Sequence, residues 1–188
     1  MTVAGVDEAG RGPLAGPVVA AAAVLTRDQA RELMALGLKD SKALSPRRRE
    51  ALFEAIRSLN VQWRAQAASW GRIDRTHVLK ASLWAMGMAV MALPVRPQLV
   101  LVDGSVPIEG LRIPQRCVVK GDSKVPSIMA ASVIAKVLRD RVMLALDRLY
   151  PQYRFASHKG YPTEEHRRIL SQLGPSPVHR RSFSFRRI

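Results

Sequence analysis

The sequence predicts an α/β domain in which helices pack on a mixed β-sheet, followed by a small helical C-terminal extension. Strand-like segments come first, helical and strand-like segments then alternate, and helical segments come last. Hydrophobic residues make up 47% of the 188 residues, which is enough for one packed core. Because no repeat or clean linker divides the chain, we expect residues 1–150 to form the main domain and residues 151–188 to pack on it.

The chain begins with a predicted hairpin. Residues 2–7 and 18–25 are apolar segments typical of strands, and the glycines and proline between them predict a turn. Ser45 and Pro46 match a helix start, since serine is a favoured N-cap and proline a favoured first helical residue. The apolar stripe of the helix that follows is formed by Leu52, Phe53, Ile56 and Leu59.

A strand and a helix are predicted next. Residues 61–69 alternate between apolar and polar side chains, as a half-buried strand does. We expect Asp74 to cap a helix that ends before Pro94. Its apolar face would be formed by Leu79, Leu83, Met86 and Val90.

Two further predicted strands each end in an acid. One apolar run leads to Asp103 and the next leads to Asp122. A long helix is expected over residues 127–149, and a loop then leads to a short helix from Thr163. The tail, residues 175–188, is rich in proline and arginine.

The charge of the chain points to a polyanionic partner. There are 30 Lys and Arg against 15 Asp and Glu, a formal net charge of +15. Nucleic acid is the leading candidate for such a partner. An anionic membrane is less favoured, because the sequence has no sustained basic amphipathic helix and the run at 18–25 is too short to cross a bilayer. A basic surface that serves only solubility is the third interpretation.

The cellular setting is inferred from simple features. Cys117 is the single cysteine, so no intramolecular disulfide can form, which fits a reducing compartment. The N-terminus has no basic segment leading into a long apolar stretch, so we find no secretory signal. We therefore expect a cytoplasmic protein without membrane association. No feature demands a dimer, so we expect a monomer.

Four acids follow apolar strand-like runs: Asp7, Glu8, Asp103 and Asp122. Sites in open α/β sheets gather where strands end, and carboxylates brought together there would repel one another without cations. Carboxylates suit Mg²⁺ or Mn²⁺, and two such ions about 3.5–4 Å apart clamp a phosphodiester in known two-metal sites. Zinc would require histidine or cysteine, and no close ligand spacing is shown by His77, His158, His166 and His179.

A structural explanation competes for each acid. A single aspartate after a strand is often a turn former or a helix cap. Asp140 is a competing fourth ligand, although it lies in a predicted helix where a basic neighbour such as Arg139 or Arg141 would pair with it.

Five segments together resemble bacterial ribonuclease HII, in the family's order and over almost the whole chain. They are GVDEAGRGPLAGPVVAAAAVL, LKDSKALSPRRRE, LVDG, VVKGDSKVPSIMAASVIAKVLRDR and SHKGYPT. The resemblance implies the ribonuclease H-like mixed sheet for residues 1–150. It also implies that Asp7, Glu8, Asp103 and Asp122 are the catalytic, metal-binding acids. The resemblance, and not the spacing, ranks Asp122 above Asp140.

The motif Gly10-Arg11-Gly12 lies directly beyond the first acids. Glycines let the backbone approach a ligand closely, and the arginine fork can bind phosphate. Backbone groups there could recognise a 2′-hydroxyl, which distinguishes RNA from DNA. The resemblance implies that this motif recognises the ribonucleotide on the 5′ side of an RNA–DNA junction, with Tyr161 stacked on its sugar. The alternative is a tight turn with a surface arginine.

Further basic and polar positions fit a surface that follows phosphates. We expect substrate contacts from Ser41, Lys42, Lys124 and Lys159, and a phosphate contact from Lys136. The tail arginines either join this surface or belong to a disordered solubilising tail. These arginines are Arg180, Arg181, Arg186 and Arg187. We expect the three tryptophans, Trp63, Trp70 and Trp84, to pack in the core.

The sequence thus predicts an endonuclease that uses Mg²⁺ or Mn²⁺. Its substrates would be RNA–DNA hybrids and duplex DNA cut 5′ to an embedded ribonucleotide, with 5′-phosphate and 3′-hydroxyl products as the resemblance implies. One alternative is a non-catalytic basic nucleic-acid binding module whose acids cap turns. Another is a two-metal nuclease of the same fold that also cuts all-DNA duplexes.

Overall fold

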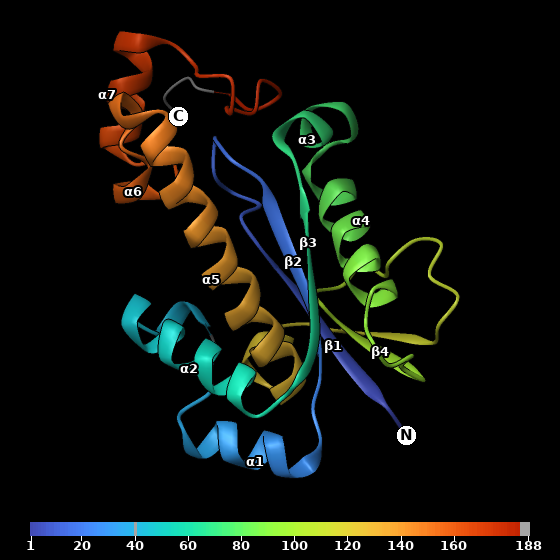
Figure 1. The fold of residues 1–188 in the computed structure, drawn as a ribbon. Helices are drawn as coiled ribbons and strands as arrows, with labels where there is room; N and C mark the ends of the chain where they lie inside the picture. Colours follow the sequence, from blue (N-terminus) through green and yellow to red (C-terminus); the bar gives the residue numbers. More distant parts are fainter. Residues whose placement is uncertain (40, 185–188) are drawn as a thin grey trace.

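The computed structural model describes residues 1–39 and 41–184, and within them the chain forms a five-stranded mixed sheet (Figure 1). The strand order is β3-β2-β1-β4-β5. The strands are β1 (Val3–Ala9), β2 (Val18–Val24), β3 (Gln62–Ala68), β4 (Leu99–Asp103) and β5 (Gln115–Val118). The first three strands pair antiparallel, whereas β1–β4 and β4–β5 are parallel pairs. The predicted mixed sheet is confirmed.

Helices cover both faces of this sheet (Figure 1). The longer ones are α1 (Arg27–Ala35), α2 (Pro46–Ser58), α4 (Val78–Met91), α5 (Pro126–Leu149) and α7 (Glu164–Leu173). Shorter helical segments are η1 (Ser41–Ala43), α3 (Trp70–Thr76), η2 (Gly121–Ser123), η3 (Pro151–Tyr153) and α6 (Phe155–His158). No helix in the described part of the chain is long and apolar enough to span a membrane.

Strand β2 is buried on both faces. Ala20 and Ala22 pack in the cluster that includes α4, whereas Ala21 and Ala23 pack in the cluster that includes α1, α2 and α5. Small side chains on both faces let the two helical layers lie close to the sheet. The alanine run is therefore a central strand.

Helix α5 lies against the backbone of β1 at Gly5. A Cβ atom there would be 2.4 Å from both the carbonyl carbon of Ser127 and the amide nitrogen of Ile128. The missing side chain thus allows the first turn of α5 to contact the strand that carries Asp7. This contact sets the distance between the helix and the acids.

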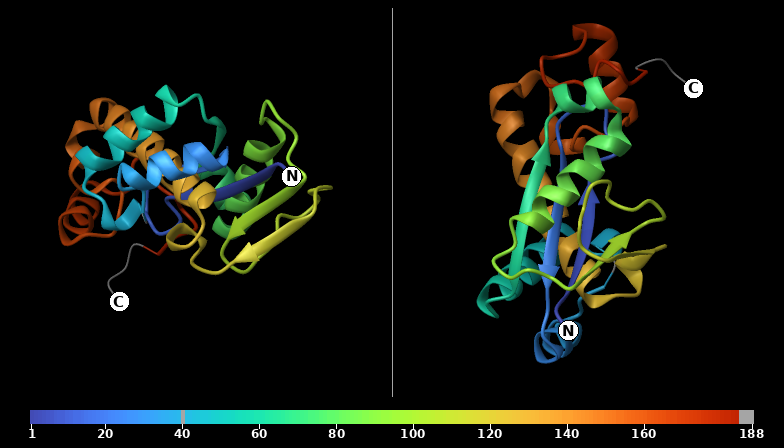
Figure 2. Two further views of the ribbon diagram at one scale, coloured as in Figure 1. Left: turned by 90° about the horizontal axis from the view of Figure 1, so that it is seen from below. Right: turned by 90° about the vertical axis from the view of Figure 1, so that its right-hand side faces the viewer.

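The C-terminal elements gather at one end of the molecule (Figure 2, orange to red). Tyr153, Phe155 and Leu170 share a core cluster with Leu14 and Met143 of the preceding part of the chain. The boundary at residue 150 therefore stays a prediction, because one core spans it.

The described part of the tail, residues 175–184, packs on the loop after β1. His179 forms a β-bridge with Ala15, and the backbone N–H of Arg180 donates to the carbonyl of Leu14 at 2.8 Å. A disordered tail is therefore wrong for this segment. Arg186 and Arg187 lie outside the described residues.

Two local predictions are wrong. Asp74 does not cap α4, because it lies inside α3, whose N-cap is Ser69. The N-cap of α4 is His77, which takes a left-handed backbone conformation with φ 75°. The Asp74 carboxylate instead accepts hydrogen bonds from the backbone N–H groups of Arg181 and Ser182.

The strand expected to end in Asp122 is shorter than predicted. Strand β5 ends at Val118, and Lys120 is left-handed with φ 55°, which breaks the extended backbone. Asp122 consequently lies in η2.

The tryptophans are packing residues, as expected. Trp63 makes an edge contact with Phe53, and Trp70 and Trp84 pack against core clusters while remaining partly exposed. The guanidinium of Arg72 covers the ring of Trp84 at 3.7 Å.

The contact at Gly5 gives a stability prediction. Gly5→Ala should lower the free energy of unfolding by about 1–3 kcal/mol, because overpacking must push α5 away from β1. Urea unfolding monitored by circular dichroism measures this. Gly71→Ala is the matched control, since its Cβ would make only ordinary contacts at 3.6 Å or more. If Gly5→Ala unfolds at the same urea concentration as the parent protein, the close contact between β1 and α5 at Gly5 is contradicted.

Candidate active site

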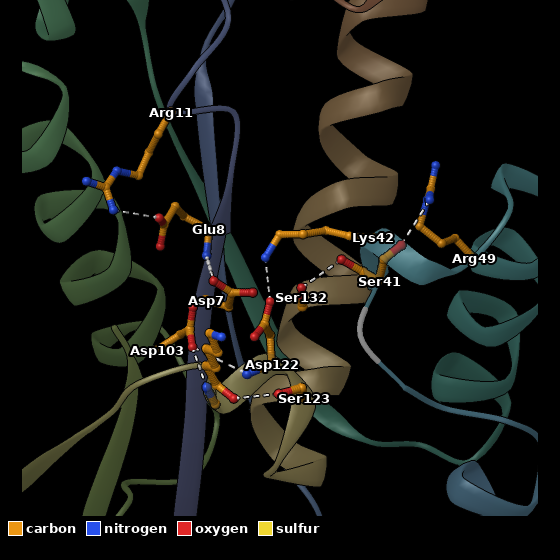
Figure 3. A network of polar contacts seen from close by, with 12 residues as sticks. Asp7, Glu8, Arg11, Ser41, Lys42, Arg49, Asp103, Asp122, Ser123 and Ser132 are labelled. Atoms are coloured by element: carbon orange, nitrogen blue, oxygen red, sulfur yellow. Dashed lines mark hydrogen bonds and ion pairs between the residues drawn. The ribbon is translucent and has the colours of Figure 1, made fainter. Parts of the chain in front are cut away.

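Three carboxylates meet at the edge shared by β1 and β4. Asp7, Asp103 and Asp122 each offer an oxygen within 4.8 Å of the others (Figure 3). The parallel register sets Val6 opposite Val102, so the next residue on each strand is an acid of this group. We call these three residues the acidic triad.

Asp122 is held beside Asp7 and Asp103 by hydrogen bonds to the Asp103 side chain. The Asp103 Oδ1 accepts hydrogen bonds from the backbone N–H groups of Gly121 at 2.7 Å and Asp122 at 3.3 Å. These bonds hold η2 against the end of β4. A residue four positions beyond strand β5 is thereby brought to the site.

The site concentrates negative charge in a buried setting. Burial raises the pKa of the Asp7 carboxyl well above its usual value, and the nearby Glu8 and Asp103 raise it further. Burial also raises the pKa of Glu8, and Asp103 adds to this, whereas Arg11 opposes it. A hydrogen bond from Ser132 partly lowers the pKa of Asp7. Carboxylates in this condition favour a bound cation with a preference for oxygen ligands, so the residues fit a divalent metal.

Glu8 differs from the acidic triad. Its Oε1 lies 3.4 Å from the Arg11 Nη1, and its backbone N–H donates to the Asp7 Oδ1 at 2.7 Å (Figure 3). Adjacent side chains diverge along a strand, which explains this separation. The role of Glu8 as a metal ligand stays a prediction.

A basic loop lies opposite the acids. The Lys42 Nζ is 2.6 Å from the Asp122 Oδ2, although its side chain is 77% exposed. The hydroxyl of Ser41 is buried and lies 2.8 Å from the hydroxyl of Ser132 on α5, and Arg49 donates to the Ser41 carbonyl at 3.0 Å. Lys42 is thus presented at the surface. Ser41 anchors the loop in this structure, and its expected contact with substrate stays a prediction.

Asp140 does not join the acidic triad. It lies 2.8 Å from the Lys136 Nζ and 3.6 Å from the Arg49 Nη2. The expected partners Arg139 and Arg141 bind elsewhere. The structure therefore places Asp122, and not Asp140, beside Asp7 and Asp103, and the ranking of the two as ligands stays a prediction. Lys136 is paired on its own helix, and its expected phosphate contact stays a prediction.

The motif 10–12 forms a turn facing Tyr161. Gly10 has φ 101°, and a Cβ on it would lie 2.0 Å from the Arg139 Nε, so only glycine fits. Gly12 has no such restriction, and the nearest atom to its Cβ would be the Tyr161 Cε1 at 3.9 Å. The side chain of Arg11 is 51% exposed. The two glycines therefore serve different purposes. A side chain at Gly10 would collide with Arg139 of the same chain, whereas the missing side chain at Gly12 leaves space beside Tyr161.

Lys124 and Lys159 contact backbone carbonyls in this structure. Lys124 is exposed beside Asp122 and donates to the carbonyl of Val119 at 2.8 Å. Lys159 is half-buried and donates to the carbonyl of Ala156. Their roles in substrate binding stay predictions.

Sequence patterns missed several residues around the site. Ser132 has a weak signal, as a serine within the apolar stretch AASVIA. Arg49 has no local signal. Arg139 was expected to pair with Asp140, and Arg180 was expected on a surface that follows phosphates or in a disordered tail, but both are buried and bind backbone carbonyls far away in the sequence. Their roles could not be predicted, because nothing in the sequence distinguishes an arginine that is buried in the fold from one that lies on the surface.

Comparisons with known proteins agree with this geometry. The family model described as Ribonuclease HII matches residues 4–186. The chain belongs to the ribonuclease HII family. A relative from Acaryochloris marina named Ribonuclease HII is 51% identical over 182 residues, covering 97% of this chain and 92% of the relative. As a member of the ribonuclease HII family, the protein is an endoribonuclease that acts on RNA–DNA hybrids.

Solved structures share the fold of this ribonuclease HII family member. The ribonuclease H2 of Pyrococcus horikoshii OT3 has a TM-score of 0.84 and 32% identity, with 98% of this chain and 95% of that chain covered. The ribonuclease HII of Archaeoglobus fulgidus, solved in complex with PCNA, has a TM-score of 0.85 and 26% identity, with 100% and 98% covered. A ribonuclease HIII in complex with Mn²⁺ has a TM-score of 0.78 and 22% identity, with 98% and 68% covered.

The pKa of Asp7 gives a prediction for the metal-free protein. A raised pKa makes ionised Asp7 unfavourable in the folded state, so this penalty is absent at acid pH and is complete above the raised pKa. Asp7→Asn should therefore raise the Tm of metal-free protein at neutral pH, by about 2–4 °C per kcal/mol relieved. The gain should shrink as pH falls toward the usual pKa of aspartate. It should be accompanied by a smaller response of Tm to Mg²⁺.

Thermal unfolding in EDTA and in Mg²⁺ measures both effects. Asp28→Asn is the control, because that side chain is 93% exposed. If the Tm of Asp7→Asn in EDTA is lower than that of the parent protein, the ionised Asp7 carboxylate does not destabilise the metal-free fold, and the prediction is wrong.

Proposed function

We propose that this protein cuts the RNA strand of hybrids and also duplex DNA 5′ to a single embedded ribonucleotide, leaving 5′-phosphate and 3′-hydroxyl ends. The observation that carries the proposal is the acidic triad, whose oxygens gather within 4.8 Å beside an exposed lysine. Gly12 lies beside Tyr161, where a Cβ would be 3.9 Å from the Cε1 atom of the ring, and this pairing suits recognition of a sugar. The family membership supports the chemistry.

The metal ligands in this proposal are Asp7, Asp103 and Asp122, with Glu8 as the fourth. Their hard oxygen donors and crowded charges suit Mg²⁺ or Mn²⁺. When bound, such ions supply Lewis-acid stabilisation of the charge that develops on phosphate oxygens.

Basic side chains around the acidic triad would bind the nucleic-acid backbone. Lys42 presents an exposed ammonium next to Asp122, and Arg11 presents an exposed guanidinium next to Glu8. Each cation would contact a phosphate as the substrate approaches. Such contacts orient the strand without distinguishing its sequence.

Selection of the ribonucleotide would depend on the space between the Gly10–Gly12 turn and Tyr161. Backbone groups of the turn would hydrogen-bond the 2′-hydroxyl, and the ring of Tyr161 would stack on the sugar. A deoxynucleotide would leave those polar groups unpaired, at about 1–3 kcal/mol for each buried group.

One assay tests the proposal against its alternatives. Labelled duplexes with zero, one or many ribonucleotides are incubated with and without Mg²⁺. Cleavage of the second and third substrates only, and only with metal, is expected. Cutting of all-DNA duplexes would indicate a general two-metal nuclease, and salt-sensitive binding without cleavage would indicate a binding module.

We further propose that the protein is a cytoplasmic monomer. Its activity would serve excision of misincorporated ribonucleotides or removal of primers.

Asp103→Asn should abolish cleavage while the fold persists. The amide oxygen can still accept the hydrogen bonds from Gly121 and Asp122, but the negative charge is lost. We expect the rate to fall by more than about 100-fold, the upper range for loss of an outer-shell partner. Initial rates in Mg²⁺ and circular dichroism measure the two effects.

Asp122→Asn and Asp140→Asn form a matched pair for the same assay. Asp122→Asn should lose as much activity as Asp103→Asn. Asp140→Asn should retain more, because Asp140 binds Lys136 and Arg49 and lies outside the acidic triad. The reverse order would move the fourth ligand to α5.

Tyr161→Ala should lower kcat/KM more on a duplex with one ribonucleotide than on a full hybrid, because a hybrid offers many productive registers. Gly12→Ala should act likewise by filling the space beside the ring, without backbone strain. Tyr161→Phe keeps the ring and is the control. Equal and small losses on both substrates would show that this space does not select the ribonucleotide.

A further inference from the structure

A buried arginine from the C-terminal segment binds the turn next to the acids. Arg180 is fully buried, and its guanidinium donates to three backbone carbonyls. The Nη2 reaches the carbonyl of Gly10 at 2.6 Å, the Nη1 that of Arg11 at 2.9 Å, and the Nε that of Gly16 at 3.0 Å. The planar fork of one side chain thus fixes three points of the loop that follows β1.

These bonds determine which way the turn faces. In a trans peptide, the carbonyl of one residue and the N–H of the next point in opposite directions. The described chain has no cis peptide bond. With the carbonyls of Gly10 and Arg11 held toward Arg180, the N–H groups of Arg11 and Gly12 point away from it. Arg180 therefore orients the backbone donors of the turn.

The neighbouring histidine acts on the opposite side of the same space. The Nδ1 of His179 accepts a hydrogen bond from the backbone N–H of Ser176 at 2.9 Å, so its proton lies on Nε2. That Nε2 faces the Nε2 of His166 at 3.0 Å, and the His166 Nδ1 is then left to donate to the carbonyl of Tyr161 at 2.9 Å. The assignment of donors is thus fixed by the acceptors that each ring faces.

Burial favours the neutral forms of His166 and His179, which these hydrogen bonds require. Burial lowers the pKa of both His166 and His179 to about 4. Both rings are therefore neutral at pH 7, so the His166 Nε2 can accept the hydrogen bond from the His179 Nε2.

A further buried arginine links the two sides. Arg139 of α5 donates to the carbonyls of Pro17 at 3.0 Å and Lys159 at 3.0 Å, and its Cζ lies 5.6 Å from the ring of Tyr161. The loop after β1 and the loop that carries Tyr161 are thus attached to one helix as well as to the C-terminal segment.

Burying Arg180 is costly, which argues against a packing role alone. Its pKa is lowered first by burial and then by the charge of Arg139. An apolar side chain could fill the same volume without desolvating a charge. Only a planar donor with several N–H groups can hold the carbonyls of Gly10, Arg11 and Gly16 together.

We propose that the segment Ser176–Arg180, called here the anchor segment, positions both sides of the ribonucleotide-binding space. Arg180 fixes the Gly10–Gly12 turn, and His179 acts through His166 on Tyr161. This inference rests on the proposed function, because it assigns the residues that set the geometry for selecting a ribonucleotide.

Arg180→Lys is the first test, since lysine keeps the charge but cannot bind three carbonyls in one plane. We expect kcat on a duplex with one ribonucleotide to fall about 10- to 100-fold, in line with a misplacement on the order of 1 Å. KM should change little, and kcat on a full hybrid should fall less. Arg168→Lys, an exposed arginine of α7, is the matched control and should match the parent protein.

Two substitutions of His166 give an independent test. The amide of asparagine can donate from nearly the position of the His166 Nδ1, whereas leucine cannot. His166→Leu should reproduce the selective loss of kcat on the one-ribonucleotide duplex, and His166→Asn should restore most of it. This pair decides the question if Arg180→Lys does not fold, as judged by circular dichroism and Tm.

The outcomes separate the two proposals. If the parent protein does not cut at a single ribonucleotide, the proposed function fails and this inference fails with it. If the parent protein cuts there and folded Arg180→Lys keeps the parent's kcat, the positioning role alone is overturned. Equal losses on both substrates in Arg180→Lys, or in both His166 variants, would also overturn it, because they would indicate a general effect on stability.

Discussion

Three like charges held within 4.8 Å at the junction of β1 and β4 are the constraint on which the surrounding structure depends. The parallel register of two strands brings Asp7 and Asp103 together, and backbone donors from η2 then bring the third acid. Two cationic side chains lie beside this group: Lys42 forms an ion pair with Asp122 at 2.6 Å, and Arg11 pairs with the neighbouring Glu8 at 3.4 Å. The chain as a whole carries a formal charge of +15, which favours a phosphate backbone as partner, and the oxygen ligands of the acidic triad suit a divalent cation.

Helix α5 connects the acids to the turn that faces Tyr161. Its first turn contacts β1 at Gly5, and its Ser132 bonds to the loop that presents Lys42. Farther along, Arg139 holds the loop after β1. A continuous helix of 24 residues therefore sets the relative positions of the acidic triad, the loop that carries Lys42 and the turn. Sites built on regular elements in this way hold their geometry more closely than sites built on loops.

The sequence allowed most of the sheet to be predicted, along with the positions of Asp7 and Asp103, because alternation and apolar runs are local signals. It misplaced the end of β5, where the left-handed Lys120 breaks a run that still looks extended. It also misassigned Asp74, whose partners lie more than a hundred residues away. The rank of Asp122 over Asp140 came from the resemblance to a family. Its physical reason, the hydrogen bonds from η2 to Asp103, depends on tertiary structure and has no local pattern.

The bond from Arg180 to Gly10 joins residues 170 positions apart. During synthesis the turn after β1 therefore lacks its buried partner until almost all of the intervening chain has been made. At about 5–20 residues per second, that interval is roughly 10–30 s. A nascent chain can pair its first two strands early, but the contacts of Arg180 with the turn form late. Completion of the buried hydrogen bonds around this turn is thus coupled to completion of the fold.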